Sequence, residues 1–296
     1  MTSGSADGLR IRFRIARRGH VGVRVARVIA LALIVGVGVS QLIFTLGDWH
    51  LSDANAYWEA AMRVRDGQPL YPVLQDIEAS AVYRYAPWFA WAWVPITFLP
   101  QWLAYVLWSL ILLAASAAAL LPLARRRAWV AVAFFFPILV GISGIGNVQP
   151  LIVAAVVLGL ERRSGPVWLA MAASLKVVPI LFVLTYVGRR EWGKALLTGV
   201  IAAVLVAPML LYDLSAYPTS AGAAALFGSP VLSAAVVAAG IVISLRLART
   251  KYGWLASATA VALAIPRFFV YDVTFLMAAL PAKTVTDRDP RHQGPN

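Results

Sequence analysis

Acidic and aromatic residues gather in one polar segment of the chain, residues 48–86, which follows the first long apolar stretch. Asp53 and Tyr57 are four positions apart, so they share one face of a short interfacial helix. Arg84 and Tyr85 come just before the chain becomes apolar again. A carboxylate, an arginine and aromatic rings are the parts of a site for a sugar phosphate.

Asp53 is the candidate general base of such a site. A weakly nucleophilic hydroxyl needs a base within hydrogen-bond reach, and Asp53 lies where a substrate could arrive. Because Asp is favoured at helix N-caps, a purely structural role in capping the interfacial helix is the alternative. Asp48 is the rival base, but no tyrosine follows it at a spacing of four residues.

Two cations, Lys176 and Arg267, lie inside apolar stretches. A cation there costs about 2.5–3.5 kcal/mol on insertion scales, so each needs a partner or a wet cavity. Together with Arg84, they are candidates to stabilise the charge that grows on a departing phosphate. The structural alternatives are a snorkelling or paired lysine and an ion pair between Arg267 and Asp272.

Four further polar residues are candidates for substrate contacts. Asn147 and Gln149 lie in a glycine-containing turn, residues 144–150, where they could bind sugar hydroxyls or satisfy the backbone of the turn. Tyr71 and Tyr271 each lie beside a break in the chain pattern. For the tyrosines, the alternative is an interfacial aromatic belt.

The composition predicts a polytopic, all-α membrane protein. Apolar residues make up 61% of the chain, charged residues 13%, and the mean hydropathy is +0.76. A full crossing takes about 20 apolar residues. The 296 residues therefore allow roughly eight to ten spans and half-spans in one membrane domain.

The basic residues lie in short segments between apolar runs, as the positive-inside rule predicts. This pattern indicates a cytoplasmic N-terminus, a retained first helix and an outward-facing polar loop, and it accounts for the net charge of +13 without a nucleic-acid partner. The expected organisation is a basic N-terminus (1–27), a first transmembrane helix (28–47), an outer catalytic loop carrying short interfacial helices (48–86), a transmembrane bundle (87–281) and a C-terminal tail (282–296).

Broken hairpins are expected in the bundle. If every basic cluster is cytoplasmic, residues 129–160 must rise and return through the turn at 144–150, and residues 167–187 must do so near Lys176. One conflict remains in the pattern. If residues 87–99 descended fully through the membrane, the arginines at 125–127 would face outside, against the charge rule.

Several chemistries find no support in the residues. The chain has no cysteine and only three histidines, which are scattered, so neither disulfides nor a metal centre is expected. No phosphate-binding glycine-rich loop ending in Lys-Ser/Thr is present, and no Ser/His/Asp set is plausible. We expect no cofactor other than a lipid-linked sugar that serves as co-substrate.

At these residues the chain resembles the polyprenyl-phosphate-dependent mannosyltransferases of glycosyltransferase family 87, which have the GT-C fold. The resemblance covers roughly residues 30–281. The elements that carry it are, in order, Asp53/Tyr57, Gly67/Tyr71, Tyr85/Pro87, Gly146-Asn147/Gln149 and Lys176/Pro179.

The resemblance implies a GT-C bundle at the plasma membrane that transfers mannose from a polyprenyl monophosphate to a hydroxyl of an envelope glycolipid or lipoglycan. Transfer would occur at the outer face by a single inverting displacement, with Asp53 as base. Substrate-binding residues would be Tyr57, Tyr71, Arg84, Tyr85, Asn147, Gln149, Lys176, Arg267 and Tyr271.

Two other functions remain open. A lipid or solute transporter would also explain broken helices and buried cations. Members of the family are usually longer, with additional C-terminal helices, so a shortened, non-catalytic membrane subunit is the second alternative. A subunit of that kind would tolerate the loss of Asp53.

Overall fold

A computed structural model of the chain describes residues 50–72, 82–214, 229–265 and 268–279, together with five single residues between 28 and 43. Every regular element in these ranges is a helix, so the all-helical prediction is confirmed for this part of the chain. The predicted first membrane helix falls largely outside the described residues. Asp48, Arg267 and both tails lie wholly outside them.

Three helical segments are long and apolar enough to cross a membrane: α4 (Gln101–Arg125), α9 (Trp192–Val206) continued by η3 (Ala207–Leu211), and α10 (Pro230–Leu247). They support a membrane protein, as the composition predicts. Shorter apolar elements complete the bundle: α5 (Trp129–Gly144), α6 (Gln149–Gly159), α7 (Gly165–Leu175), η2 (Val178–Phe182), α8 (Val183–Gly188), α11 (Gly253–Leu263) and η4 (Val270–Ala279).

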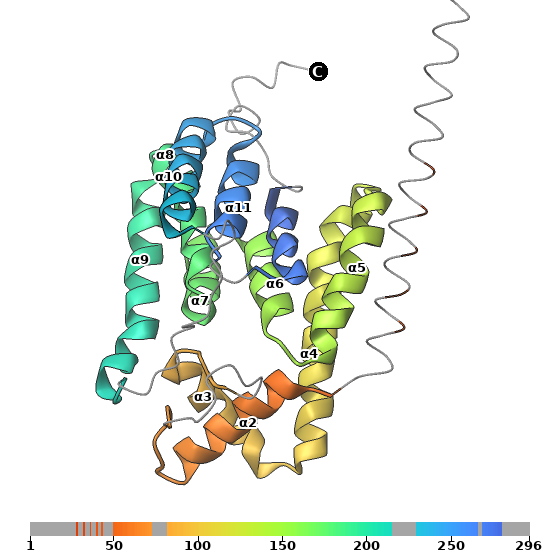
Figure 1. The fold of residues 1–296 in the computed structure, drawn as a ribbon, viewed down its shortest axis with the longest axis vertical. Coiled ribbons are helices and arrows are strands. Elements are labelled where there is room, and N and C mark those ends of the chain that lie inside the picture. The colour runs from red at the N-terminus through yellow and green to blue at the C-terminus, as the bar shows by residue number, and fades with distance from the viewer. Residues whose placement is uncertain are drawn as a thin grey trace, which may run out of the picture.

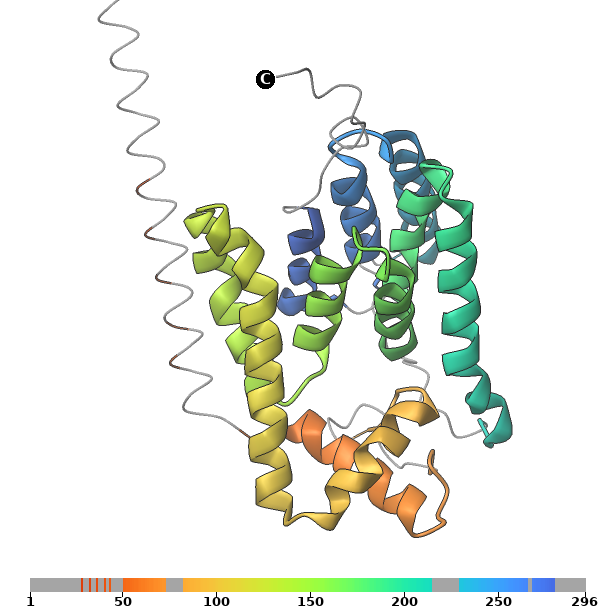
Figure 2. The same cartoon turned by 180° about the vertical axis from the view of Figure 1, so that it is seen from behind.

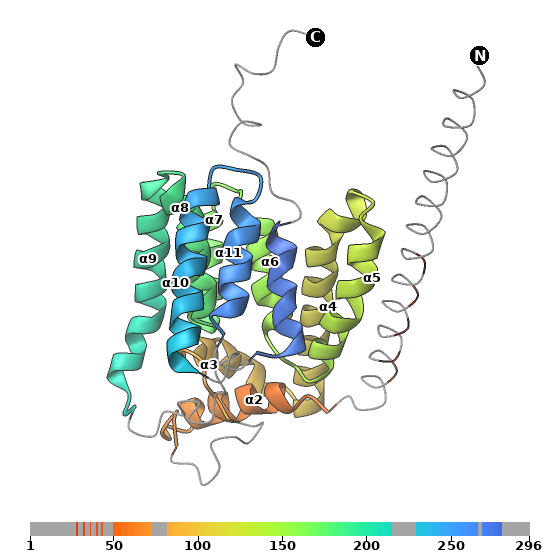
Figure 3. The same ribbon diagram turned by 45° about the horizontal axis from the view of Figure 1, so that its top comes forward.

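The elements from α4 onward run back and forth between two ends of the molecule (Figure 1). The connections from α4 to α5, from α6 to α7, from α8 to α9 and from α10 to α11 all lie at one end (Figure 3). We call it the basic end, because these connections and their flanks carry Arg125–Arg127, Arg162, Arg163, Arg189, Arg190, Arg246, Arg249 and Lys251.

Two of the expected breaks are present, and the one at residues 266–267 lies outside the described residues. The chain turns back between α5 and α6, where Gly146 has a φ of +79°. It turns back again between α7 and α8, where Lys176 has extended backbone and Pro179 lies in the first turn of η2. Proline and glycine both favour a break in the helix. Proline lacks a backbone N–H donor, and glycine adopts a left-handed conformation without strain.

A separate layer covers the opposite end, which we call the α2 end. It consists of α2 (Ser52–Arg65), α3 (Pro87–Trp93) and η1 (Val94–Phe98), which pack against one another. Seen from behind, α4 starts beside this layer and runs to the basic end (Figure 2). Because α3 and η1 stay in the layer, Arg125–Arg127 lie with the other basic residues, and the conflict in the sequence pattern disappears.

Aromatic residues form the core of this layer. The ring of Tyr57 contacts the rings of Phe89, Trp93 and Trp108 edge-on, with centroids 5.0, 5.6 and 5.9 Å away. Trp108 Nε1 also donates a hydrogen bond of 2.8 Å to the carbonyl of Gly146. Each aromatic pair adds about 0.5–1.5 kcal/mol beyond its buried area. The layer is thereby fixed to α4 and to the α5–α6 turn.

At the basic end, Arg189 joins three connections. Its guanidinium donates 3.1 Å to Glu161 and 2.8 Å to the carbonyl of Ala248, and it lies 4.9 Å above the ring of Trp254. Trp254 Nε1 donates to the same carboxylate of Glu161. The Arg189 side chain is only 2% exposed, so this cluster is part of the packed structure.

Candidate functional site

A pocket of about 360 Å³ lies on the side of the bundle that faces the α2 end. Its walls come from the segment before α3, from the turn that starts α6, from the break after α7, and from η3 and η4. We call it the polar pocket. It brings together six of the predicted site residues: Arg84, Tyr85, Asn147, Gln149, Lys176 and Tyr271.

Asp53 lies beside this pocket because the first turn of α2 is docked on the α5–α6 turn. The Asp53 backbone N–H donates to the carbonyl of Ile145 over 2.9 Å. Asn147 Nδ2 donates to Asp53 Oδ2 over 2.5 Å. The N-cap of α2 is Leu51, without a side-chain cap, so the alternative of Asp53 as the N-cap residue is wrong.

Gly146 permits this close approach. Its φ of +79° is a conformation that side chains rarely adopt. A Cβ at this position would lie 2.7 Å from the Cβ and 2.8 Å from the backbone nitrogen of Ala54. Any other residue would therefore push the first turn of α2 away from the turn that carries Asn147.

The surroundings of Asp53 suit a base. Desolvation by burial raises the pKa of Asp53, while the hydrogen bond from Asn147 and the charges of Arg84 and His50 oppose that rise. A carboxylate with a raised pKa accepts a proton more readily than an exposed aspartate does. General bases work best when their pKa approaches the working pH.

Lys176 forms a partly buried ion pair at the break after α7. Its Nζ lies 2.5 Å from Asp272 Oδ1 and 5.1 Å from the ring centre of Tyr271. Asp272 is fully buried, and its Oδ2 accepts a hydrogen bond of 2.9 Å from the backbone N–H of Phe269. The lysine side chain is 25% exposed and lines the polar pocket, so it stands between a buried carboxylate and the open space.

Asp272 is the site residue that sequence reasoning missed. The isolated charge of Asp272 in an apolar stretch indicated that this residue has a cationic partner, but the sequence pointed to Arg267 as that partner. Arg267 lies outside the described residues, so an ion pair between it and Asp272 stays a prediction. Within the described part of the chain, Lys176 pairs with Asp272 from 96 positions away.

The side chains of Asn147 and Gln149 make hydrogen bonds within the protein and also line the polar pocket. Asn147 Oδ1 accepts a hydrogen bond of 2.8 Å from the backbone N–H of Gln149 at the start of α6. Gln149 Nε2 donates to Thr274 Oγ1 over 3.1 Å, which ties α6 to η4. Asn147 therefore orients two groups at once, the helix start and the carboxylate of Asp53.

The tyrosines of the polar segment do not all contact the pocket. Tyr57 and Tyr71 are 1% and 5% exposed and are not among its lining residues. Tyr57 OH donates to Tyr85 OH over 3.1 Å, and Tyr71 OH donates to the Tyr85 carbonyl over 2.8 Å. Burial raises the pKa of Tyr57 well above its ordinary value, so it stays a phenol. Both tyrosines hold Tyr85, which does line the pocket.

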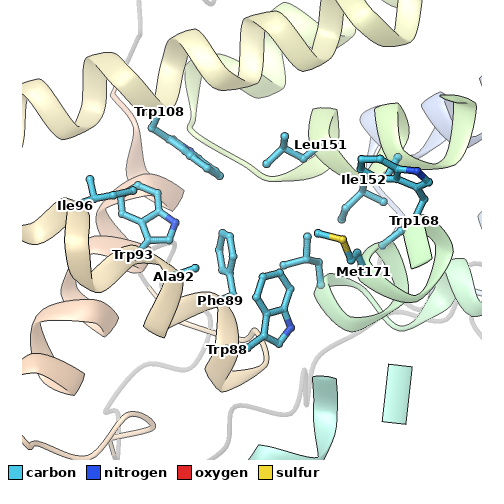
Figure 4. Close-up of a pocket in the computed structure, with 13 residues that line it drawn as sticks. Trp88, Phe89, Ala92, Trp93, Ile96, Trp108, Leu151, Ile152, Trp168 and Met171 are labelled. Carbon is cyan, nitrogen blue, oxygen red and sulfur yellow. The ribbon is translucent and has the colours of Figure 1, made fainter. Parts of the chain in front are cut away.

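An apolar pocket of about 250 Å³ adjoins the polar one. Ile152 and Leu175 line both, so the two spaces meet at these side chains. Figure 4 shows indole and phenyl rings from α3 and α4 facing aliphatic side chains and Met171 from α6 and α7. We call it the apolar pocket; its lining includes Trp88, Phe89, Trp93, Ile96, Trp108, Leu151, Trp168 and Met171.

Neither a metal-binding cluster nor a comparison with known proteins identifies a ligand for the polar pocket. Among the described residues, no group of three or more His, Asp or Glu side chains could hold a metal ion. Comparison with protein-family models, with curated proteins and with solved structures gave no match. The resemblance to family 87 thus rests on the sequence motifs, and the function is argued from the site.

Proposed function

We propose that the chain is a membrane glycosyltransferase that moves a hexose, with mannose as the first candidate, from a polyprenyl monophosphate to a hydroxyl of an envelope glycolipid or lipoglycan. One observation carries the proposal. A pocket with two cations, Arg84 and Lys176, lies next to a desolvated carboxylate, Asp53, and Asn147 contacts both the pocket and that carboxylate.

The arrangement suits a single displacement. The acceptor oxygen attacks the anomeric carbon, and the bond from that carbon to the phosphate oxygen breaks, so that the phosphate leaves with the electron pair. Asp53 takes the proton of the acceptor hydroxyl. Arg84 and Lys176 offset the charge that grows on the phosphate. Attack opposite the leaving group inverts the anomeric carbon.

The apolar pocket suits the lipid part of this donor. Its wall is almost wholly hydrocarbon and aromatic, and it meets the polar pocket at Ile152 and Leu175. A molecule with a phosphate head and an isoprenoid chain has the same order of polar and apolar parts. Burial of the chain contributes about 25 cal/mol per Å² of apolar surface.

The distribution of charge supports an orientation in the membrane. The basic connections lie together at the basic end (Figure 3), and the positive-inside rule favours the cytoplasm for such an end. The α2 end and the polar pocket then face the outside of the plasma membrane. Lipid-linked monophosphate sugars at that leaflet need no soluble nucleotide-binding domain.

A lipid or solute transporter is the second candidate, because the Lys176–Asp272 pair lies where two helices are broken. The asymmetry of the structure favours the transferase: α2, α3 and η1 cover one end only, and they hold Asp53 against the bundle. A non-catalytic subunit is the third candidate function, and a protein of that kind would need no general base.

The test is transfer of labelled sugar from polyprenyl-phosphate mannose to an envelope glycolipid extract. Membranes would carry the wild type, Asp53→Asn, or the matched control Asp66→Asn, whose carboxylate is half exposed in the loop after α2. The proposal requires turnover by the wild type and the control and its loss in Asp53→Asn. Equal activity of all three would remove Asp53 from the mechanism, and no activity in any would favour the subunit or the transporter.

A further inference from the structure

A further groove, of about 850 Å³, lies at the basic end and shares no lining residue with the polar pocket. Its floor comes from the first half of α5, the start of α11 and the end of η4. Most of that floor is apolar, and its aromatic rim is exposed: Trp129 is 61% exposed and Tyr252 50%. We call it the basic-end groove; its lining includes Ala128, Trp129, Val130, Phe134, Phe135, Tyr252, Leu255 and Leu276.

Two cations complete the lining, Arg127 from the α4–α5 connection and Lys251 from the α10–α11 connection. Within the described ranges, neither forms a salt bridge with a carboxylate. Lys251 Nζ lies 5.1 Å from the ring centre of Tyr252, which belongs to the same wall. The groove therefore has positive charge at the loops and hydrocarbon along the helices.

Arg127 occupies a position that normally belongs to glycine. Its φ is +57°, and α4 ends there in a Schellman motif: Arg127 N donates to the carbonyl of Ala124 over 2.9 Å, and Ala128 N donates to that of Leu123 over 3.0 Å. A left-handed conformation strains any residue with a Cβ. Glycine would therefore be more favourable for the backbone at this position than the arginine that occupies it.

We propose that the basic-end groove binds an anionic phospholipid, with the phosphate between Arg127 and Lys251 and an acyl chain against Trp129, Phe134 and Leu255. The argument is the order of charges and apolar surface, which matches a lipid whose head lies at the membrane surface. Anionic lipids bind basic pockets between helices on the cytoplasmic side, the side assigned to this end above. The site is separate from the polar pocket and does not depend on sugar transfer.

The chain provides a matched control for Arg127. Arg190 has a φ of +61° and ends α8 in the same motif, with Arg190 N and Glu191 N donating 2.9 Å each to the carbonyls of Val187 and Tyr186. It also lies at the basic end, but it does not line the groove. Replacement of either arginine by glycine removes one positive charge and relieves the same strain.

The experiment is native mass spectrometry of the full chain in detergent, with added dioleoyl-phosphatidylglycerol or dioleoyl-phosphatidylcholine. We expect wild type to prefer phosphatidylglycerol. Arg127→Gly and Lys251→Gln should each reduce that preference about fivefold and together about 25-fold, while Arg190→Gly retains it. The melting temperature of Arg127→Gly without lipid should be no lower than that of wild type, so the loss cannot come from misfolding.

Three results would overturn the proposal. One is equal binding of the two lipids by the wild type. Another is the same loss in Arg190→Gly as in Arg127→Gly, which would mark a general charge effect. The third result would come from paired cysteines, which can be introduced cleanly because the chain has no cysteine of its own. One cysteine would replace Val130 (Val130→Cys) and the other would be placed in residues 28–46. A disulfide formed between them in full yield would show that the first apolar segment of the chain itself fills the groove.

Discussion

Asn147 Nδ2 donates a 2.5 Å hydrogen bond to Asp53 Oδ2, although the two residues are 94 positions apart in the chain. The bond joins the one carboxylate of the first turn of α2 to the turn that starts α6. Asn147 also lines the polar pocket, so a change in the pocket and a change at the carboxylate are linked through one amide.

Asp53→Asn should lower turnover by about 10²–10⁴-fold, the usual contribution of a general base. It should not lower stability. Because burial raises the folded-state pKa of Asp53, the fold is destabilised as the pH rises through that pKa and the carboxylate ionises. The neutral amide avoids this cost and still accepts from Asn147. The melting temperature in detergent at pH 8 should therefore equal or exceed that of wild type; a clear drop would indicate a structural role instead.

Asn147→Ala should move the acid limb of the pH–rate profile to higher pH. The hydrogen bond from Asn147 stabilises the ionised carboxylate and lowers its pKa, so its removal leaves the desolvation effect less opposed. The base is then protonated at a higher pH, and activity falls earlier on acidification. Rates of wild type and variant between pH 5 and pH 9 would measure the displacement, and an unchanged limb would exclude Asp53 as the titrating group.

The Lys176–Asp272 pair allows stability and activity to be separated. Asp272→Ala leaves a largely buried ammonium without its partner and should cost about 3 kcal/mol. The double change Lys176→Met with Asp272→Asn removes both charges and keeps an acceptor for the Phe269 N–H, so stability should largely return. Activity should not return, because the pocket has lost a cation. Recovery of both, in unfolding and transfer assays, would make the pair purely structural.

Gly146→Ala should destabilise the protein more than Gly67→Ala does. Both glycines have a positive φ, +79° and +68°, so alanine at either position carries the same backbone penalty of about 1–2 kcal/mol. Only at Gly146 would the new Cβ collide with Ala54; nothing lies within 4 Å at Gly67. We expect an additional cost of about 1–3 kcal/mol and reduced transfer for Gly146→Ala alone. Equal melting temperatures of the two variants would show that the α2 docking is loose.

Single cysteines can test the arrangement of the two ends, because the chain has none of its own. Arg126→Cys, Arg163→Cys and Arg190→Cys belong to three different connections at the basic end and should react with an impermeant maleimide only after the cell membrane is opened. Gln68→Cys, in the loop after α2, should react in intact cells. Labelling of any basic-end cysteine in intact cells would contradict the proposed orientation.

Local patterns predicted the helices and their breaks, because proline, glycine and apolar runs act through the nearest residues. Thus the turn at Gly146 and the break at Lys176 both occur where the sequence indicated. The pairing of Lys176 with Asp272, and of Asn147 with Asp53, could not be read in this way. Those contacts depend on which helices lie side by side, and no residue within a turn of either partner encodes that.

The docking of α2 through backbone hydrogen bonds has a further consequence. Leu51 N and Asp53 N donate hydrogen bonds to the carbonyls of Gly144 and Ile145. The position of the candidate base is therefore fixed by the end of α5 and not by the lipid surface. Bilayers of different thickness tilt or shift a helical bundle. Base and pocket should move together under such a tilt, and their separation should stay constant in thin and thick membranes alike.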